Sequence, residues 1–252
     1  MQTLKDLLHR WSLFEEDRES VKVLDNSFIA FDLQQTLQGS LKDQYDKVEL
    51  ALSYYSSLKE ILGANKVVIP TNTIEEFRRG SYKIERRTRR IIKGLRKRKL
   101  QDTSKEEKLR NFCKVSRKVR DEIVYLAKDF IPKFSAEDLI SDEINYSNTI
   151  LPAVKKVVEN TTVKISYHER HNNDPGLEEN NDNDEEIFAK SLAINLSLDK
   201  PVRIYTCDSD FIRLKKEFFK RAGGISRQYN FKKPSKKDIL VSFYDNQGLL
   251  EF

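Results

Sequence analysis

The stretch VRIYTCDSDF, residues 202–211, decides the fold that we expect for this chain. Its first half predicts a strand, and a helical pattern begins directly after it. VKVL at 21–24 and KVVIP at 66–70 are further apolar runs of strand length, and each is also followed by a helical pattern. Strands that alternate with helices predict an α/β fold with a mainly parallel sheet.

The remaining periodicity predicts where the other elements lie. We expect further strands at TTVKISY and at the C-terminal runs ISRQYNF and ILVSFY, residues 161–167, 225–231 and 239–244. Helices are expected over 26–37, 43–65, from 71 onward, 104–130, in a less regular region over 135–160, over 184–198, and over 209–223, where Gly223-Gly224 would close the last one. Residues 1–20 predict an N-terminal helical extension, and the polar residues at about 168–183 predict an acidic, flexible loop.

Positive charge is concentrated in one segment. The net charge is +6, but Arg78 to Arg120 hold 19 Lys and Arg against four acids, a balance of +15 that leaves −9 for the rest. A basic helical-hairpin insertion at about 78–132 would present these side chains, and a polyanion, with nucleic acid as the leading candidate, is the expected partner. The predicted nucleic-acid-binding residues are Arg86, Arg87, Arg89, Arg90, Arg96, Lys97, Arg98 and Lys99. A solvated helical face, or packing on an acidic segment of this chain or a partner, is the alternative.

Composition limits the other function classes. No apolar run approaches the roughly 20 residues that cross a bilayer, so no membrane partner is expected. Cys113 and Cys207 show no paired spacing, which favours a reducing compartment. We therefore expect a cytoplasmic protein, with the nucleus as the alternative because RKRK at 96–99 resembles a nuclear import signal.

Carboxylates recur where an α/β fold gathers its functional groups. Asp25 and Asp208 each end a predicted strand, at the edge where such sheets bind ligands. Glu76 and Asp184 lie near the starts of helices, and Asp210 follows Asp208 by two residues. Carboxylates are the ligands that Mg²⁺ and Mn²⁺ prefer. Taken singly, Asp184 and Asp208 could be helix caps and Glu76 a solvated helix residue.

Four segments, VLDNSFIAF, IPTNTIEEF, DEEIFAKSLAI and IYTCDSDF, resemble in order and spacing the signature segments of PIN-domain nucleases. The resemblance implies a three-layer α/β/α fold for about 20–230, and a domain that would here extend over 21–252. It also implies catalytic and metal-ligand roles for Asp25, Glu76, Asp184 and Asp208, with Asp210 as a possible fifth ligand and Thr206 in a supporting role. Asp182, Glu185 and Glu186 compete with Asp184 for the third position, and Glu75 competes with Glu76.

The expected function is that of a Mg²⁺- or Mn²⁺-dependent endoribonuclease, in which metal-activated water attacks the phosphodiester. Its RNA preference, single-stranded over duplex, follows from the resemblance, and DNA stays open as a substrate. The alternatives are a structure-selective DNase of the related flap-nuclease type and a catalytically weak RNA-binding scaffold. A protein inhibitor or a larger complex is compatible with this function.

Overall fold

The computed structural model describes 17–30, 41–64, 67–77, 103–126, 135–159, 183–245 and 248–251, with single positions at 8, 9, 11, 14, 86, 89, 90, 93 and 128. The chain forms two compact units. The helical unit contains 1–16, 30–65 and 74–133, and the sheet unit contains 17–29, 66–73 and 134–252. The helical unit thus takes in the expected insertion at 78–132, residues 1–16 of the expected N-terminal extension, and helix α4 (Leu41–Ala64).

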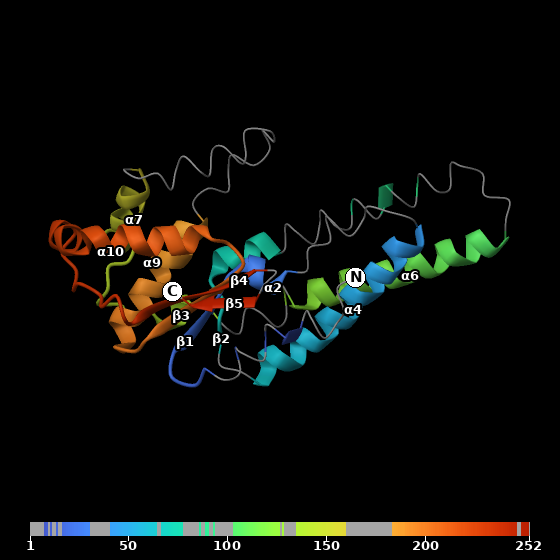
Figure 1. The fold of residues 1–252 in the computed structure, drawn as a ribbon, viewed down its shortest axis with the longest axis horizontal. Helices are drawn as coiled ribbons and strands as arrows, with labels where there is room; N and C mark the ends of the chain where they lie inside the picture. Colours follow the sequence, from blue (N-terminus) through green and yellow to red (C-terminus); the bar gives the residue numbers. More distant parts are fainter. Residues whose placement is uncertain are drawn as a thin grey trace. The chain divides into compact units, whose positions relative to one another are not determined.

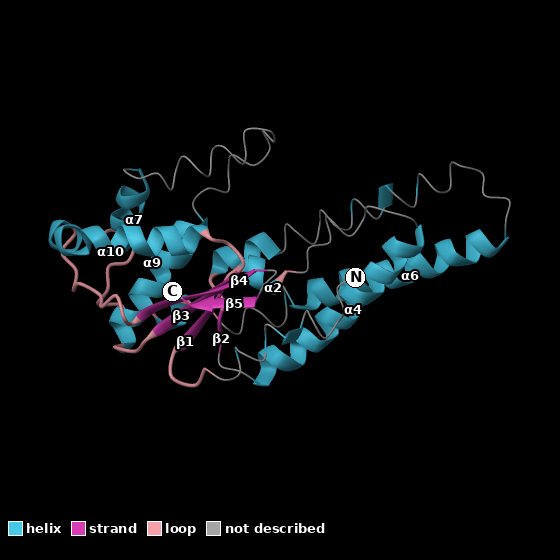
Figure 2. Cartoon of the chain, viewed as in Figure 1, coloured by secondary structure: helices cyan, strands magenta, loops and turns pink. Residues whose placement is uncertain are grey.

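One five-stranded sheet forms the centre of the sheet unit (Figures 1 and 2). Its strand order is β2-β1-β3-β4-β5, and the strands are β1 (Val21–Leu24), β2 (Val67–Val68), β3 (Val202–Thr206), β4 (Ile239–Asp245) and β5 (Gly248–Glu251). The first four are parallel, and β5 returns antiparallel to β4. The predicted α/β class with a mainly parallel sheet is confirmed, whereas β5 was not anticipated.

Three helices pack together with this sheet around one apolar core: α7 (Ile150–Glu159), α9 (Asn183–Leu198) and α10 (Asp210–Gln228). Alternate strand residues face that core, among them Val23, Val202, Ile204, Ile239 and Val241. Because β1 and β3 are parallel neighbours with Leu24 opposite Tyr205, Asp25 and Thr206 follow at the same edge of the sheet. The fold therefore brings the ends of β1 and β3 and the start of α10 together, as Figure 1 shows.

The end of α10 corrects one prediction. ISRQYNF was expected to be a strand after a helix closed by Gly223-Gly224, but α10 continues through both glycines to Gln228. Ile225 and Ser226 extend its buried face, which favours helix over strand. The chain leaves the helix through Tyr229 and Asn230, and the φ of 54° at Asn230 is left-handed. The N–H of Phe231 donates to the carbonyl of Ser226 at 3.0 Å, which completes the hydrogen-bond pattern of a left-handed helix terminus.

The helical unit contains α4 (Leu41–Ala64) packed on α6 (Thr103–Tyr125), close to the helices predicted at 43–65 and 104–130. The apolar face of α6 is buried at Phe112, Val119 and Ile123, and Leu126 directly after the helix is also buried. Of the described positions of the N-terminal extension, 8, 9, 11 and 14 are helical and 17–20 are not, and its Trp11 and Phe14 are buried. The strand expected at 161–167 and the loop expected at 168–183, apart from Asn183, lie outside the described residues.

Ser135–Glu159 is less helical than expected. It starts with an isolated bridge from Ser135 to Ile69, followed by the short 3-10 helix η3 (Glu137–Leu139), and becomes α-helical only in α7. Within the part of the chain that the structure describes, no helix combines the length and the apolar character that crossing a membrane requires.

Candidate metal centre

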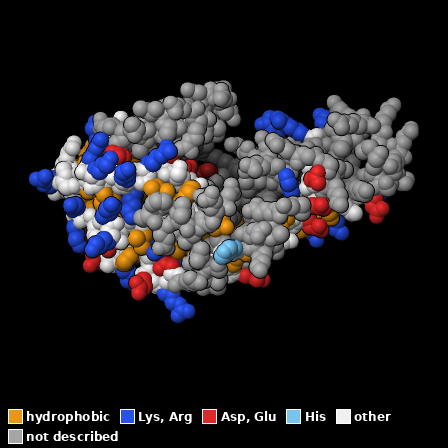
Figure 3. All heavy atoms as spheres, in the orientation of Figure 1, with side chains coloured by type: hydrophobic (Ala, Val, Ile, Leu, Met, Phe, Trp, Pro, Cys, Tyr) orange, Lys and Arg blue, Asp and Glu red, His pale blue; other side chains and the backbone are white. Residues whose placement is uncertain are grey.

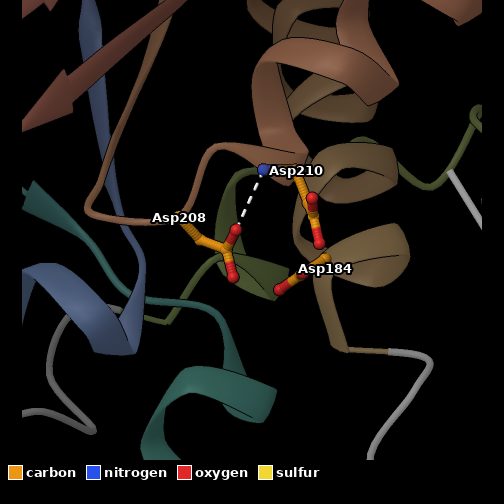
Figure 4. Close-up of side chains that lie close together, drawn as sticks. All are labelled: Asp184, Asp208 and Asp210. Atoms are coloured by element: carbon orange, nitrogen blue, oxygen red, sulfur yellow. Dashed lines mark hydrogen bonds between the residues drawn. The ribbon is translucent and has the colours of Figure 1, made fainter. Parts of the chain in front are cut away.

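Three aspartates converge at the carboxyl edge of the sheet. Asp184 lies in the first turn of α9, Asp208 follows β3, and Asp210 is the first residue of α10. One carboxylate oxygen from each lies within 4.8 Å of the other two. Figure 4 shows the three side chains directed toward a common space from two helices and the loop between β3 and α10. The start of α9 and the connection from β3 into α10 thus build one acidic cluster.

Local hydrogen bonds fix the turn that carries Asp208. Its Oδ1 accepts the backbone N–H of Asp210 at 2.9 Å, which is the dashed line in Figure 4. Its own backbone N–H donates to Oγ1 of Thr206, also at 2.9 Å. Asp208 therefore holds the turn that leads into α10 and also contributes to the acidic cluster. The N-cap of α10 is Ser209 rather than Asp208, and the role of Asp208 as a metal ligand stays a prediction.

Asp25 lies beside this cluster, and its side chain is almost fully enclosed, with 3% exposed. Its Oδ2 accepts hydrogen bonds from the hydroxyls of Ser27 and Thr206, the latter at 2.9 Å. Burial raises the pKa of the Asp25 carboxyl, the Ser27 and Thr206 hydrogen bonds oppose that rise, and the negative charge of Asp208 adds to it. Among the described residues the three-aspartate group does not include Asp25. Asp25 is therefore an electrostatic neighbour of the cluster.

Two hydroxyls connect Asp25 to the loop that holds Asp208. Ser27 donates to Asp25 and accepts the backbone N–H of Cys207 at 2.9 Å. Thr206 donates to Asp25 and accepts the N–H of Asp208. The end of β1 and the loop after β3 are thereby fastened by side chains as well as by the sheet. This is a physical basis for the supporting role predicted for Thr206.

The donor set of the cluster suits a hard divalent cation. Three carboxylate oxygens within 4.8 Å of one another repel strongly unless positive charge lies among them. Arg213 supplies part of that charge, because its Nη1 lies 3.5 Å from Oδ1 of Asp210 while half of its side chain stays exposed. The Asp210 residue itself is only 4% exposed. Oxygen-only ligands in this number fit Mg²⁺ or Mn²⁺ with waters in the remaining positions.

A second polar network fixes α9, the helix of Asp184. Lys190, with 8% of its side chain exposed, contacts Oε1 of Glu137 at 2.6 Å and donates to Oδ1 of Asn72 at 2.8 Å. The Asn72 amide in turn donates to Glu186. Against a penalty from burial, hydrogen bonds from Lys190, Ser135 and Thr71 lower the pKa of Glu137 to about 2. These contacts join the first half of α9 to η3 and to the segment after β2.

The structure brings together only some of the predicted carboxylates. Asp184, Asp208 and Asp210 form the cluster, and of the acids that competed with Asp184, Glu186 bonds to Asn72 instead. Glu185 is described but is not in the cluster, and Asp182 lies outside the described residues. Glu76 is half-buried and Glu75 exposed on the helix 71–77. Both belong to the helical unit, whose position relative to the aspartates is not determined.

The predicted nucleic-acid-binding residues are described in part. Arg86, Arg89 and Arg90 are helical and exposed, as is Lys93 nearby. Arg87 and the second group, Arg96, Lys97, Arg98 and Lys99, lie outside the described residues. The exposed arginines are compatible with phosphate contacts, and their role stays a prediction.

Comparisons with known proteins name no family for this chain. No family model, no curated protein and no solved structure matches it. The resemblance to PIN-domain nucleases therefore rests on the four segments quoted from the sequence.

Sequence reasoning missed four residues that shape the site: Ser27, Asn72, Glu137 and Lys190. Ser27 had a local signal, because a serine two residues after an aspartate commonly bonds to its side chain. No local sequence signal marked Asn72, Glu137 and Lys190, since their partners are up to 118 residues away along the chain. Long-range polar contacts of this kind leave no periodic trace in a sequence.

Proposed function

We propose that the chain is a divalent-metal-dependent endoribonuclease with a PIN-like, three-layer α/β/α domain. The observation that carries the proposal is the convergence of Asp184, Asp208 and Asp210, with their carboxylate oxygens within 4.8 Å, at the carboxyl edge of a parallel sheet. Such edges are where open α/β sheets bind their ligands. The four sequence segments that resemble PIN-domain nucleases supply the choice of RNA.

In this proposal Asp184, Asp208 and Asp210 hold Mg²⁺ or Mn²⁺, and Asp25 and Glu76 are the further predicted ligands. The bound ion would supply Lewis acidity, which activates water and offsets the charge that builds on the phosphodiester. Ser27 and Thr206 hold the Asp25 carboxylate and the Asp208 loop in one arrangement. Lys190 and Asn72 fix the first turns of α9 and so position Asp184.

The exposed arginines of the helical unit favour a nucleic acid over a small phosphate ester as the substrate. RNA rather than DNA, and endonucleolytic rather than structure-selective flap cleavage, follow only from the resemblance. The alternative outside the enzymes is a catalytically weak RNA-binding scaffold. The scaffold is disfavoured because binding alone requires no three converging carboxylates.

The decisive assay is cleavage of an internally labelled single-stranded RNA by the full chain in Mg²⁺ or Mn²⁺, with EDTA as the metal-free arm. Asp208→Asn should abolish cleavage. Asp199→Asn is the matched control, because Asp199 is 91% exposed on the turn after α9. Cleavage that persists in EDTA, or that is equal in Asp208→Asn and the wild type, contradicts the proposal. A DNA strand of the same sequence tests the sugar preference.

A further inference from the structure

The sheet unit carries a second concentration of positive charge. Between Lys200 and Asp238 there are 12 Lys and Arg against four acids, a balance of +8. Figure 3 shows Lys and Arg side chains gathered over the part of the surface where Figure 1 places α10. The positive excess of residues 78–120 belongs to the helical unit, so the predicted basic insertion does not explain this surface.

The cations of α10 form one row. Its exposed basic stripe, as we name it, consists of Arg213, Lys216, Lys220 and Arg227. Spacings of three, four and seven residues place all four on one face of a helix. The opposite face is buried at Phe211, Leu214, Phe218, Ala222 and Ile225. At a rise of about 1.5 Å per residue, the stripe is about 21 Å long.

The stripe begins at the aspartate cluster. Arg213 is its first member, and the 3.5 Å contact between Nη1 of Arg213 and Oδ1 of Asp210 connects the two features directly. From there the row follows α10 away from the carboxyl edge of the sheet. A chain of phosphates lying on this row would therefore reach the carboxylates at one end.

Within α10, acidic side chains neutralise only part of the stripe, since Arg213 contacts Asp210 and Lys220 contacts Glu217. Beyond its first residue, α10 has one acid, Glu217, which is paired with Lys220. A hydrogen bond from Lys220, together with the charges of Arg221 and Lys216, lowers the pKa of Glu217. One carboxylate thus lies among three cations, which leaves the surface strongly positive and complementary to a polyanion.

We propose that the exposed basic stripe binds the sugar-phosphate backbone of single-stranded RNA and guides it to the aspartate cluster. A single row about 21 Å long matches one strand, because a stacked strand advances roughly 3.4 Å per nucleotide along its axis and so spans about six nucleotides over this length. Binding of a single nucleic-acid strand stands on the stripe alone. The choice of RNA and the statement that the guided strand is then cut rest on the proposed function.

Binding is measured by fluorescence anisotropy of a labelled 16-nucleotide RNA, with the full chain in EDTA, at several salt concentrations. The test variant is Lys216→Gln with Lys220→Gln. Its matched control is Lys233→Gln with Lys237→Gln, which removes the same charge from exposed positions of the loop that precedes β4. The test variant should flatten the log–log salt slope by about 1.4 and weaken binding roughly 10- to 25-fold at 0.1 M salt. The control should change affinity less than threefold.

A charge change of the opposite sign excludes a merely structural effect. Glu217→Gln removes the acid within the stripe and should strengthen RNA binding about threefold to fivefold, whereas Asp199→Asn should leave it unchanged.

Equal affinities for the Lys216/Lys220 and Lys233/Lys237 variants would overturn the inference and assign the stripe to an acidic protein partner. Tighter, equally stripe-dependent binding of a 16-base-pair duplex would overturn the single-strand preference. Stripe-dependent binding without any cleavage in Mn²⁺ would refute the nuclease proposal and leave the binding surface intact.

Discussion

The Oγ1 of Thr206 donates a hydrogen bond of 2.9 Å to Oδ2 of Asp25, 181 residues earlier in the chain. The same oxygen accepts the backbone N–H of Asp208. One buried hydroxyl therefore couples the carboxylate at the end of β1 to the loop that places an aspartate of the candidate metal centre.

Replacing Thr206 with Val should break this coupling while preserving the side-chain shape. Both the Asp25 carboxylate and the Asp208 N–H lose a buried partner, so we expect a destabilisation of about 1–3 kcal/mol. In a chain of this size each kcal/mol lowers Tm by roughly 2–4 °C. Thr206→Ser keeps the hydroxyl and should stay close to the wild type in both Tm and cleavage. Equal behaviour of the Val and Ser variants would show that the hydroxyl is not needed.

Asp25→Asn should abolish cleavage without destabilising the metal-free protein. Burial and the nearby charge of Asp208 disfavour the ionised Asp25, while an amide oxygen can still accept from Ser27 and Thr206. In EDTA at neutral pH, Tm should be unchanged or higher by a few degrees. A fall of more than about 4 °C, measured by differential scanning calorimetry, would show instead that the ionised carboxylate stabilises the fold.

Glu137→Gln should destabilise the protein in a pH-dependent way. The pKa of Glu137 falls from 4.5 to about 2 on folding, so its contribution is fully present above pH 4.5 and is lost as the pH falls through 2. Because the side chain is 43% exposed, we expect only about 1–2 kcal/mol at pH 7. Urea denaturation at pH 7, 4.5 and 3 should show the difference from the wild type narrowing. Asp138→Asn, at the exposed neighbouring position, is the control, and a difference independent of pH would contradict the ion pair with Lys190.

Gly223→Ala and Gly224→Ala should each stabilise the protein by about 0.5–1 kcal/mol. Both glycines lie inside α10, and a Cβ at either position meets no atom within 4 Å. Alanine reduces the freedom of the unfolded chain without straining the helix. The measurement is the midpoint of urea unfolding, which should rise at constant m-value. A lower midpoint would show that this turn of the helix needs the flexibility of glycine.

The same pair of glycines shows which helix boundaries can be predicted from the sequence. A Gly-Gly pair after an amphipathic run is a common helix end, yet here the apolar face continues through Ala222 and Ile225, and the left-handed residue is Asn230. The strand β5 was missed because four residues starting with glycine give too short a pattern to detect. The parallel strands β1, β3 and β4 were predicted correctly because apolar and β-branched residues mark them strongly.

For the candidate site, the sequence could predict residues that a local pattern marks. It could not predict contacts between residues that are far apart along the chain. Asp25 and Asp208 were found because each lies within two residues of the end of a recognisable strand. Lys190 and Glu137 were not, because no local pattern distinguishes a partly buried ion pair from two surface charges. The exposed basic stripe of α10 was overlooked because its cations alternate with core residues and form no run in the sequence.

The central claim, that Asp184, Asp208 and Asp210 form a divalent-cation site, is tested most directly by isothermal titration of Mn²⁺ into the full chain without RNA. We expect saturable binding that Asp208→Asn weakens at least tenfold, whereas Asp199→Asn keeps the wild-type affinity. Equal Mn²⁺ affinity in the wild type and Asp208→Asn would contradict the account.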